Sequence, residues 1–260
     1  DKEDRTGTGT KSIFGRTIRH NMSLGFPILT GKKVSFNAAR TELLWILNGR
    51  TDLKYLEDNG VKYWRPDYER SGRKDGTLGP VYGKQWRDFN GVDQLESVVD
   101  AIRVNPQSRR IMVSAWNPAE LSEMALPPCH YGFQIYINNG VMDLMWQQRS
   151  VDVFLGLPYD ISMYGLLLEM LAKGARLIPG ELIGQFGDCH LYNNHLDQAR
   201  EYRGRPKRAL PKLELDSGIY KPYHAIGLGR NIINIPEKNE IKLINYNPLP
   251  AIKAELSVGK

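Results

Sequence analysis

The 260-residue sequence predicts a mixed fold of helices and strands, and three patterns carry this prediction. Apolar and more polar residues alternate over 133–137, which is typical of a strand, and the turn at 138–140 ends in Asn-Gly, which predicts a hairpin into a second strand over 141–148. Leu95 to Ile102 places apolar side chains at helical spacing. Residues 161–171 are almost all apolar, which predicts a helix buried on most of its sides.

The other expected elements follow from local signals. Ser35 is a suitable N-cap for a helix over about 36–48, and Gly49 is suited to end it. Residues 61–91 are rich in Trp, Tyr, Arg and Gly, which predicts an irregular loop, and loops of this length are usually functional. The remaining expected elements are a strand at 12–15, a helix at 51–60, a strand at 111–116, a polar helix that ends near Gly204, and short strands after 210.

Composition and charge limit the class of protein. Hydrophobic residues make up 41% and charged residues 25% of the chain, and no linker or repeat interrupts it, so a single globular domain over residues 1–260 is expected. No apolar run reaches the length of a membrane span and the N-terminus does not resemble a signal peptide, so we expect a cytoplasmic protein. The net charge of +6 is compatible with nucleic acid or with small phosphorylated molecules, but no nucleic-acid-binding motif accompanies it.

Cys129 is the first candidate for chemistry. Pro127 and Pro128 fix the backbone before it and a strand follows it, so its thiol lies on a rigid turn that suits a nucleophile. A buried structural cysteine is the alternative. The other cysteine, Cys189, completes neither a disulfide framework nor a metal-ligand spacing, so a reducing compartment fits and no metal site is predicted.

Glu42 is the second candidate, because its surroundings predict burial. Its neighbours at helical spacing, Ala38, Ala39, Trp45 and Ile46, are all apolar. A buried carboxylate needs a partner or shifts toward its neutral form. Glu42 is therefore either functional or paired in a salt bridge across the core, for instance with an arginine.

Further features each have two explanations. The polar, glycine-rich segment 5–10 could hold a phosphate through its backbone N–H groups and Arg5, or form an ordinary turn. Trp64 and Tyr82 could face a flat ligand or only pack. Asp160 comes directly before the apolar helix, where it could serve as an N-cap.

Arg109 and Arg110 are adjacent and open the expected strand at 111–116. Because neighbouring residues on a strand point to opposite faces, only one of the two arginines is expected on a given face.

Seven segments, taken together and in order, resemble the thymidylate synthase family: RTGTGT, ELLWIL, LGPVYGKQW, SRRIMVSAWN, PPCH, QQRSVDVFLGLP and GDCHLYNNH. The match runs from Asp4 to about Val258, nearly the whole chain. The resemblance implies the α+β class, with helices that flank a mixed, kinked β-sheet, and an obligate homodimer in which the two sheets stack. It also implies transfer of a one-carbon unit from 5,10-methylenetetrahydrofolate, a co-substrate, to C5 of a pyrimidine nucleoside monophosphate.

The resemblance implies a role for each matching residue. Cys129 corresponds to the nucleophile that adds to C6, Glu42 to a proton carrier, and Tyr82 and Asp160 to further catalytic residues. The residues expected to bind the nucleotide are Arg5, Arg109, Arg110, Gln148, Arg149, Ser150, Asp152, Asp160, His190 and Tyr192. Within this set, Arg109 and Arg110 would reach the phosphate in the other subunit's site, and His190 and Tyr192 would hold the sugar hydroxyl. The residues expected to contact the folate are Trp64, Asp152, Leu155, Gly156, Tyr159 and Val258.

Asp160 departs from the family pattern, since thymidylate synthases carry Asn at this position. That Asn donates to O4 of uracil and accepts from N3–H, whereas cytosine has a donor at N4 and an acceptor at N3. A carboxylate accepts from N4–H and from a protonated N3, and the relatives with Asp at this position act on dCMP. We therefore expect a dCMP C5-methylase. The alternatives are a dCMP 5-hydroxymethylase, a thymidylate synthase that acts on dUMP, and, from a different class, an RNA-binding or regulatory protein.

Smaller departures concern the folate side and the last step. Ser35 replaces a family histidine near the folate, and two extra residues, Gly259 and Lys260, follow the usual tail. These departures leave open whether a hydride or water completes the reaction. Trp64 and the rest of the C-terminal tail, which matches the family, favour hydride and a methyl product. Arginines near Cys129 are expected to favour its thiolate.

Overall fold

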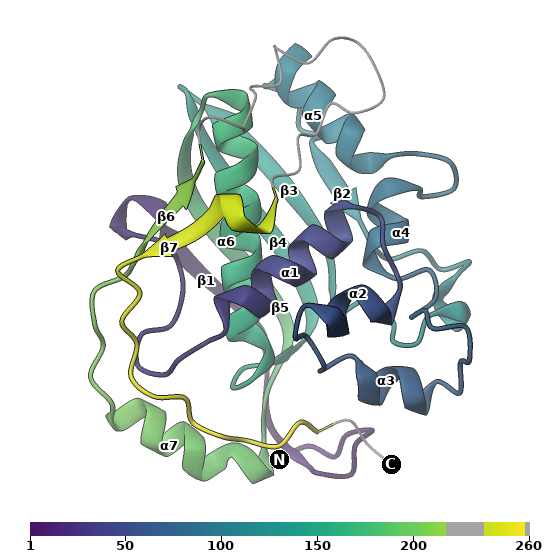
Figure 1. Ribbon diagram of the computed structural model, residues 1–260, viewed down its shortest axis with the longest axis vertical. Coiled ribbons are helices and arrows are strands. Elements are labelled where there is room, and N and C mark those ends of the chain that lie inside the picture. Colours follow the sequence, from purple (N-terminus) through teal and green to yellow (C-terminus); the bar gives the residue numbers. More distant parts are fainter. Residues whose placement is uncertain (217–236, 258–260) are drawn as a thin grey trace.

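The computed structural model describes residues 1–216 and 237–257, and a five-stranded sheet of order β1-β5-β4-β3-β2 forms its centre (Figure 1). The strands are β1 (Thr10–Asn21), β2 (Met112–Ser114), β3 (His130–Asn138), β4 (Val141–Asp152) and β5 (Ile178–Tyr192). β4 and β5 are parallel and the other neighbours are antiparallel, so the sheet is mixed. The pairing register shifts within β3 and within β4, and such irregularities bend a strand.

Helices flank this sheet, which gives the expected α+β class. α6 (Gly156–Ala175) packs on β4 and β5, and α1 (Phe36–Leu47) packs on α6 (Figure 1). Trp146 of β4 stacks on Tyr164 of α6 with ring centroids 5.2 Å apart, which marks the buried face of the sheet. The other helices are α2 (Leu53–Asp58), α3 (Arg65–Arg70), α4 (Tyr82–Arg87), α5 (Gln94–Val104) and α7 (Leu196–Gly204).

Shorter elements complete the described chain. β6 (Lys212–Leu215) and β7 (Ile241–Ile244) form a separate antiparallel pair, in agreement with the short strands expected after residue 210. Single 3-10 turns lie at Met22–Leu24, Leu121–Glu123, Asn193–His195 and Lys238–Glu240. Within the two described ranges, no helix combines the length and apolar content needed to cross a membrane.

Several local predictions are confirmed. The hydroxyl of Ser35 accepts from the backbone N–H of Ala38 at the start of α1, and Gly49 follows the helix with φ +68°. Asn139 and Gly140 both have positive φ, +48° and +79°, as the tight turn between β3 and β4 requires. The helix expected from Leu95 to Ile102 is α5.

The prediction missed β5, because the glycines that the strand needs hide its pattern. A Cβ at Gly184 would lie 2.7 Å from the ring of Trp146, and a Cβ at Gly187 would lie 2.8 Å from the carbonyl oxygen of Arg149. These glycines let β5 approach β4 closely. Glycine is uncommon in strands, so the sequence of this segment does not indicate one. Similarly, the expected loop at 61–91 contains α3 and α4, and the expected strand at 12–15 is part of the longer β1.

Two predictions about local position are wrong. The buried helix begins at Gly156 and not at residue 161, so Asp160 lies inside α6 and is not its N-cap. The side chain of Asp152 instead accepts from the N–H groups of Phe154 and Leu155 before the helix. Arg109 and Arg110 lie in a turn before β2, so the alternation of a strand does not separate their side chains.

Candidate active site

One end of the central sheet gathers the expected residues around a cavity of about 460 Å³. β3 begins and β4 and β5 end at this edge, and the parallel pairing places Asp152 beside His190. The backbone N–H of Arg149 donates to the carbonyl oxygen of Cys129 at 2.9 Å. The expected residues that line the cavity are Arg5, Glu42, Trp64, Tyr82, Cys129, Gln148, Arg149, Ser150, Asp152, Leu155, Gly156, Tyr159, Asp160, His190 and Tyr192.

Two of the expected residues lie elsewhere, and a third cannot be placed. Arg109 and Arg110 are exposed in the turn before β2 and do not line this cavity. Val258 lies outside the described residues. The cavity wall also includes residues to which no role was assigned from the sequence: Tyr63, Asp67, Leu126, His130, Leu256 and Ser257. Leu126 and His130 flank the Pro-Pro-Cys turn and Tyr63 precedes Trp64, so adjacency along the chain was an available signal for these three.

Cys129 lies on a turn that side chains hold from two sides. The guanidinium of Arg149 donates to the carbonyl oxygens of Pro128 at 2.8 Å and Pro127 at 2.9 Å, and the hydroxyl of Tyr82 accepts from the N–H of Cys129 at 3.0 Å. Burial raises the pKa of the Cys129 thiol to about 11, and the nearby Arg149 opposes this rise. Arg149 therefore favours the thiolate as expected, but burial is the larger effect and the thiol is protonated in the free protein.

Glu42 has the buried position that its apolar neighbours predict, with 8% of its surface exposed. Tyr63 donates to its Oε2 and the indole of Trp64 donates to its Oε1, each at 2.6 Å. Burial raises the pKa of Glu42, while these two hydrogen bonds lower it. Among the described residues its partners are thus a phenol and an indole, so the alternative of a salt bridge to an arginine is wrong.

Asp160 faces the same cavity from α6. The amide nitrogen of Gln148 donates to its Oδ2 at 2.8 Å, and the indole of Trp146 donates to the amide oxygen of Gln148 at 3.1 Å. Because an indole N–H can only donate, it sets the orientation of the Gln148 amide. Burial raises the pKa of Asp160 to about 7, although the hydrogen bond from Gln148 opposes the rise. Near neutral pH the carboxyl is therefore divided between its protonated and ionised forms.

The glycine-rich turn before β1 does not offer its backbone to a phosphate. The carboxylate of Asp4 accepts from the N–H groups of Thr6 and Gly9, and the hydroxyl of Thr6 accepts from the N–H of Thr8. The N–H of Gly7 donates to the carbonyl oxygen of Asp4. This part of the prediction is wrong: the segment contributes the side chain of Arg5 to the cavity and not a set of backbone donors.

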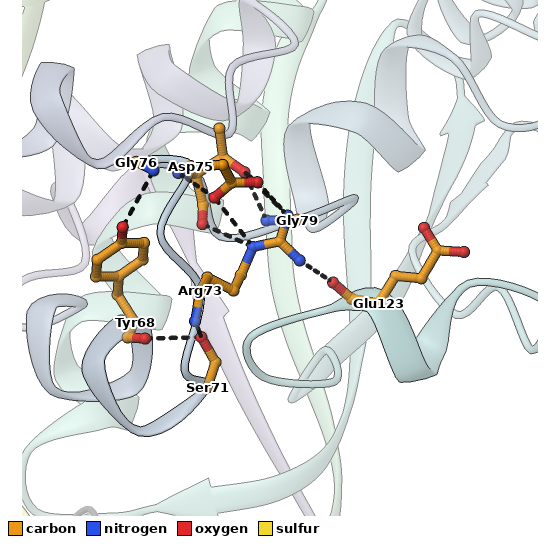
Figure 2. Close-up of polar contacts among 8 residues, drawn as sticks. Tyr68, Ser71, Arg73, Asp75, Gly76, Gly79 and Glu123 are labelled. Carbon is orange, nitrogen blue, oxygen red and sulfur yellow. Dashed lines mark hydrogen bonds and ion pairs between the residues drawn. The ribbon is translucent and has the colours of Figure 1, made fainter.

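Arg73 connects the segment that carries Tyr82 to the segment that carries Cys129. Figure 2 shows its guanidinium directed at Asp75 and at the backbone of Glu123. It donates to the carbonyl oxygen of Glu123 at 2.8 Å and to that of Thr77 at 3.0 Å. The backbones of Leu78 and Ala125 also pair, at 2.9 Å, so the two segments run together toward the cavity.

The thymidylate synthase family model matches residues 1–258 of the chain. The match includes every strand of the central sheet and all the residues that line the cavity.

We predict that Arg73→Lys lowers kcat roughly tenfold with little change in KM for the nucleotide, because a small displacement of reacting groups is costly to turnover. Lysine keeps the charge, but it lacks the planar fork whose separate nitrogens donate to Asp75, Thr77 and Glu123. Steady-state kinetics of the purified variant measure the effect. Arg103→Lys, which alters a partly buried ion pair with Asp100 on α5, is the matched control, and an unchanged kcat in Arg73→Lys would contradict the positional role.

Proposed function

The chain belongs to the thymidylate synthase family, and on this basis we propose that it is a dCMP C5-methylase that produces 5-methyl-dCMP. The family carries out folate-dependent methyl transfer to C5 of a pyrimidine nucleotide, with methylenetetrahydrofolate as the co-substrate. The choice of dCMP rests on Asp160. The cavity wall formed by Trp64, Leu155 and Tyr159 offers apolar and aromatic surface that suits a flat pterin.

The observation that supports cytosine is a buried carboxyl with a pKa of about 7 at the position that faces the base in this family. A protonated carboxyl donates to N3 of cytosine and accepts from its N4–H, which uses both hydrogen-bonding groups. N3 of cytosine is also much more basic than O4 of uracil. The proton can therefore move to N3 and activate C6 of cytosine toward attack, whereas uracil gains only binding from the same proton.

Side chains of the cavity supply the other parts of the reaction in this proposal. The Cys129 thiolate adds to C6, which makes C5 nucleophilic toward the methylene carbon of the co-substrate. Glu42 moves protons at C5, for which a raised pKa is suited. Arg5 and Arg149 hold the phosphate, and His190 and Tyr192 hold the sugar.

A second product has support from the wall of the cavity. Tyr63 contributes a hydroxyl and Asp67 a carboxylate on the side where Trp64 lies. Polar groups there are suited to retain a water molecule. A retained water would complete the reaction as 5-hydroxymethyl-dCMP instead of 5-methyl-dCMP. Absorbance of dihydrofolate distinguishes the two, since it forms only when a hydride is transferred.

The proposed enzyme is a homodimer that shares residues between its sites. Met112 and Tyr136 are 54% and 61% exposed, and they lie on the sheet face opposite the one that α6 covers. Exposed apolar side chains on an open sheet face are typical of an interface. Arg109 and Arg110 are exposed outside their own chain's cavity, as residues that serve a partner's phosphate site would be.

We predict that wild-type enzyme prefers dCMP over dUMP and that Asp160→Asn reverses or narrows this preference by at least about tenfold, since a buried polar mismatch costs about 1–3 kcal/mol. Asn offers a donor toward O4 of uracil at every pH and removes the acidic proton that cytosine uses. The measurement is kcat/KM for both nucleotides with both proteins. Glu169→Gln, a similar change on the same helix but away from the cavity, is the control, and an unmoved ratio in Asp160→Asn would rule out the role of Asp160.

The pH dependence gives an independent prediction. Because the pKa of Asp160 is raised to about 7, its proton is present below that pH and is lost above it. We predict that kcat/KM for dCMP, divided by the same quantity for Asp160→Asn, falls about tenfold per pH unit above pH 7. Cys129 ionises in both proteins, and burial, which Asp160→Asn leaves in place, has the largest effect on its pKa. A quotient that stays constant from pH 6 to about 9 would contradict the role of the proton.

Subunit mixing tests the shared site. Cys129→Ser and Arg110→Ala are each expected to be inactive, but their heterodimer contains one site with neither defect. We predict recovery of about one quarter of wild-type activity after equal mixing, because half of the dimers are then mixed and each has one sound site. Arg103→Ala removes the same charge as Arg110→Ala but should leave the subunit active, so its mixture with Cys129→Ser is not informative. The control is a mixture of Cys129→Ser with a variant that lacks both Cys129 and Arg110. This mixture contains no intact nucleophile and should stay inactive. Absence of recovery after verified exchange would contradict sharing.

A further inference from the structure

Tyr63 lies on the cavity wall and has no role in the methyl-transfer steps proposed above. Its hydroxyl donates to Oε2 of Glu42 at 2.6 Å, while Trp64 donates to Oε1 at the same distance. The Tyr63 ring lies 6.0 Å from the ring of Tyr159, on the wall of the cavity. Both oxygens of the buried carboxylate are thus held by residues that adjoin each other in sequence.

We propose that Tyr63 is a positioning residue for Glu42, which fixes the carboxylate in one orientation and sets the pH range in which it accepts a proton. This inference rests on the proposed function only in that Glu42 carries protons in the proposed reaction. It assigns a function to the second carboxylate oxygen, Oε2, and makes that oxygen the one that exchanges a proton.

The two donors differ in what they allow. An indole N–H donates and cannot accept, so Trp64 can never receive a proton from Oε1. A phenol hydroxyl both donates and accepts, so Tyr63 can keep its hydrogen bond to Oε2 whether Glu42 is ionised or protonated. A proton on Glu42 is therefore best accommodated on Oε2, next to the hydroxyl of Tyr63.

The charges around Glu42 make its protonation depend on this hydroxyl. Burial raises the pKa of Glu42, and the hydrogen bonds from Tyr63 and Trp64 are what lower it. Asp160 and Tyr164, both on α6, interact electrostatically with Glu42, and ionisation of either would disfavour its charge. Burial and Glu42 itself raise the pKa of Tyr63 well above its usual value, so its hydroxyl remains a donor. Further ionisable groups on the cavity wall are Arg5, Asp67, Tyr82, Cys129, His130, Arg149, Asp152, Tyr159, His190 and Tyr192.

The direct test is a carbon-13 NMR titration of glutamate carboxyl groups in wild type and Tyr63→Phe, without substrate. Glu42→Gln identifies the Glu42 signal. Phenylalanine keeps the ring against Tyr159 but removes one donor to the charged form, so the Glu42 pKa is expected to rise by about one pH unit. Tyr55→Phe, the same chemical change outside the cavity, should leave the Glu42 titration unchanged. A Glu42 titration in Tyr63→Phe that coincides with that of wild type would overturn the proposal.

A kinetic test adds the consequence for turnover. A raised Glu42 pKa leaves the carboxylate protonated to a higher pH, so the acid limb of kcat for Tyr63→Phe should move upward by the shift that the NMR titration gives. Trp64 remains in both proteins, as does Asp160, so neither accounts for a difference. Loss of activity at all pH values without displacement of the limb would contradict the positioning role. Because the titration needs no substrate, it can fail or succeed separately from the assignment of dCMP as substrate.

Discussion

Burial at the end of the β4–β5 pair governs the chemistry of this molecule. Cys129, Glu42 and Asp160 all line the same cavity, and burial raises the pKa of each ionisable group above its ordinary value. The consequences differ because the neighbours differ. Two donors hold Glu42, one amide holds Asp160, and Arg149 only partly offsets the burial of Cys129.

The strands make this arrangement possible through close backbone approach. At Gly184 and Gly187 a side chain would collide with β4, so β5 can pair along its length only because these positions lack a Cβ. The pairing then delivers the end of β5 to the end of β4, next to the turn that carries Cys129. The loop that Arg73 holds leads to Tyr82, whose hydroxyl accepts from the N–H of Cys129. Position in the sheet thus determines which side chains share the cavity.

Local signals were sufficient where one interaction decides the outcome. The N-cap at Ser35 and the buried face of Glu42 follow from neighbours within one or two turns of helix, and both are confirmed. Sequence signals did not predict an element where contacts between distant segments determine its position. β5 was hidden by the glycines that its packing requires, and the start of α6 depends on Asp152 at the end of β4. Tyr63 could not be assigned a role from the sequence, because its partner Glu42 is distant in the chain and the contact is tertiary.

The central claim is that this member of the family acts on cytosine, and a competition experiment tests it most directly. Wild-type enzyme is given equal amounts of dCMP and dUMP with methylenetetrahydrofolate, and the nucleotides are analysed by mass spectrometry while most of both substrates remains. We predict that dCMP gains the mass of one CH2, because a methyl group replaces the hydrogen on C5, and that dihydrofolate forms with it. Predominant conversion of dUMP to its methylated product would contradict the account.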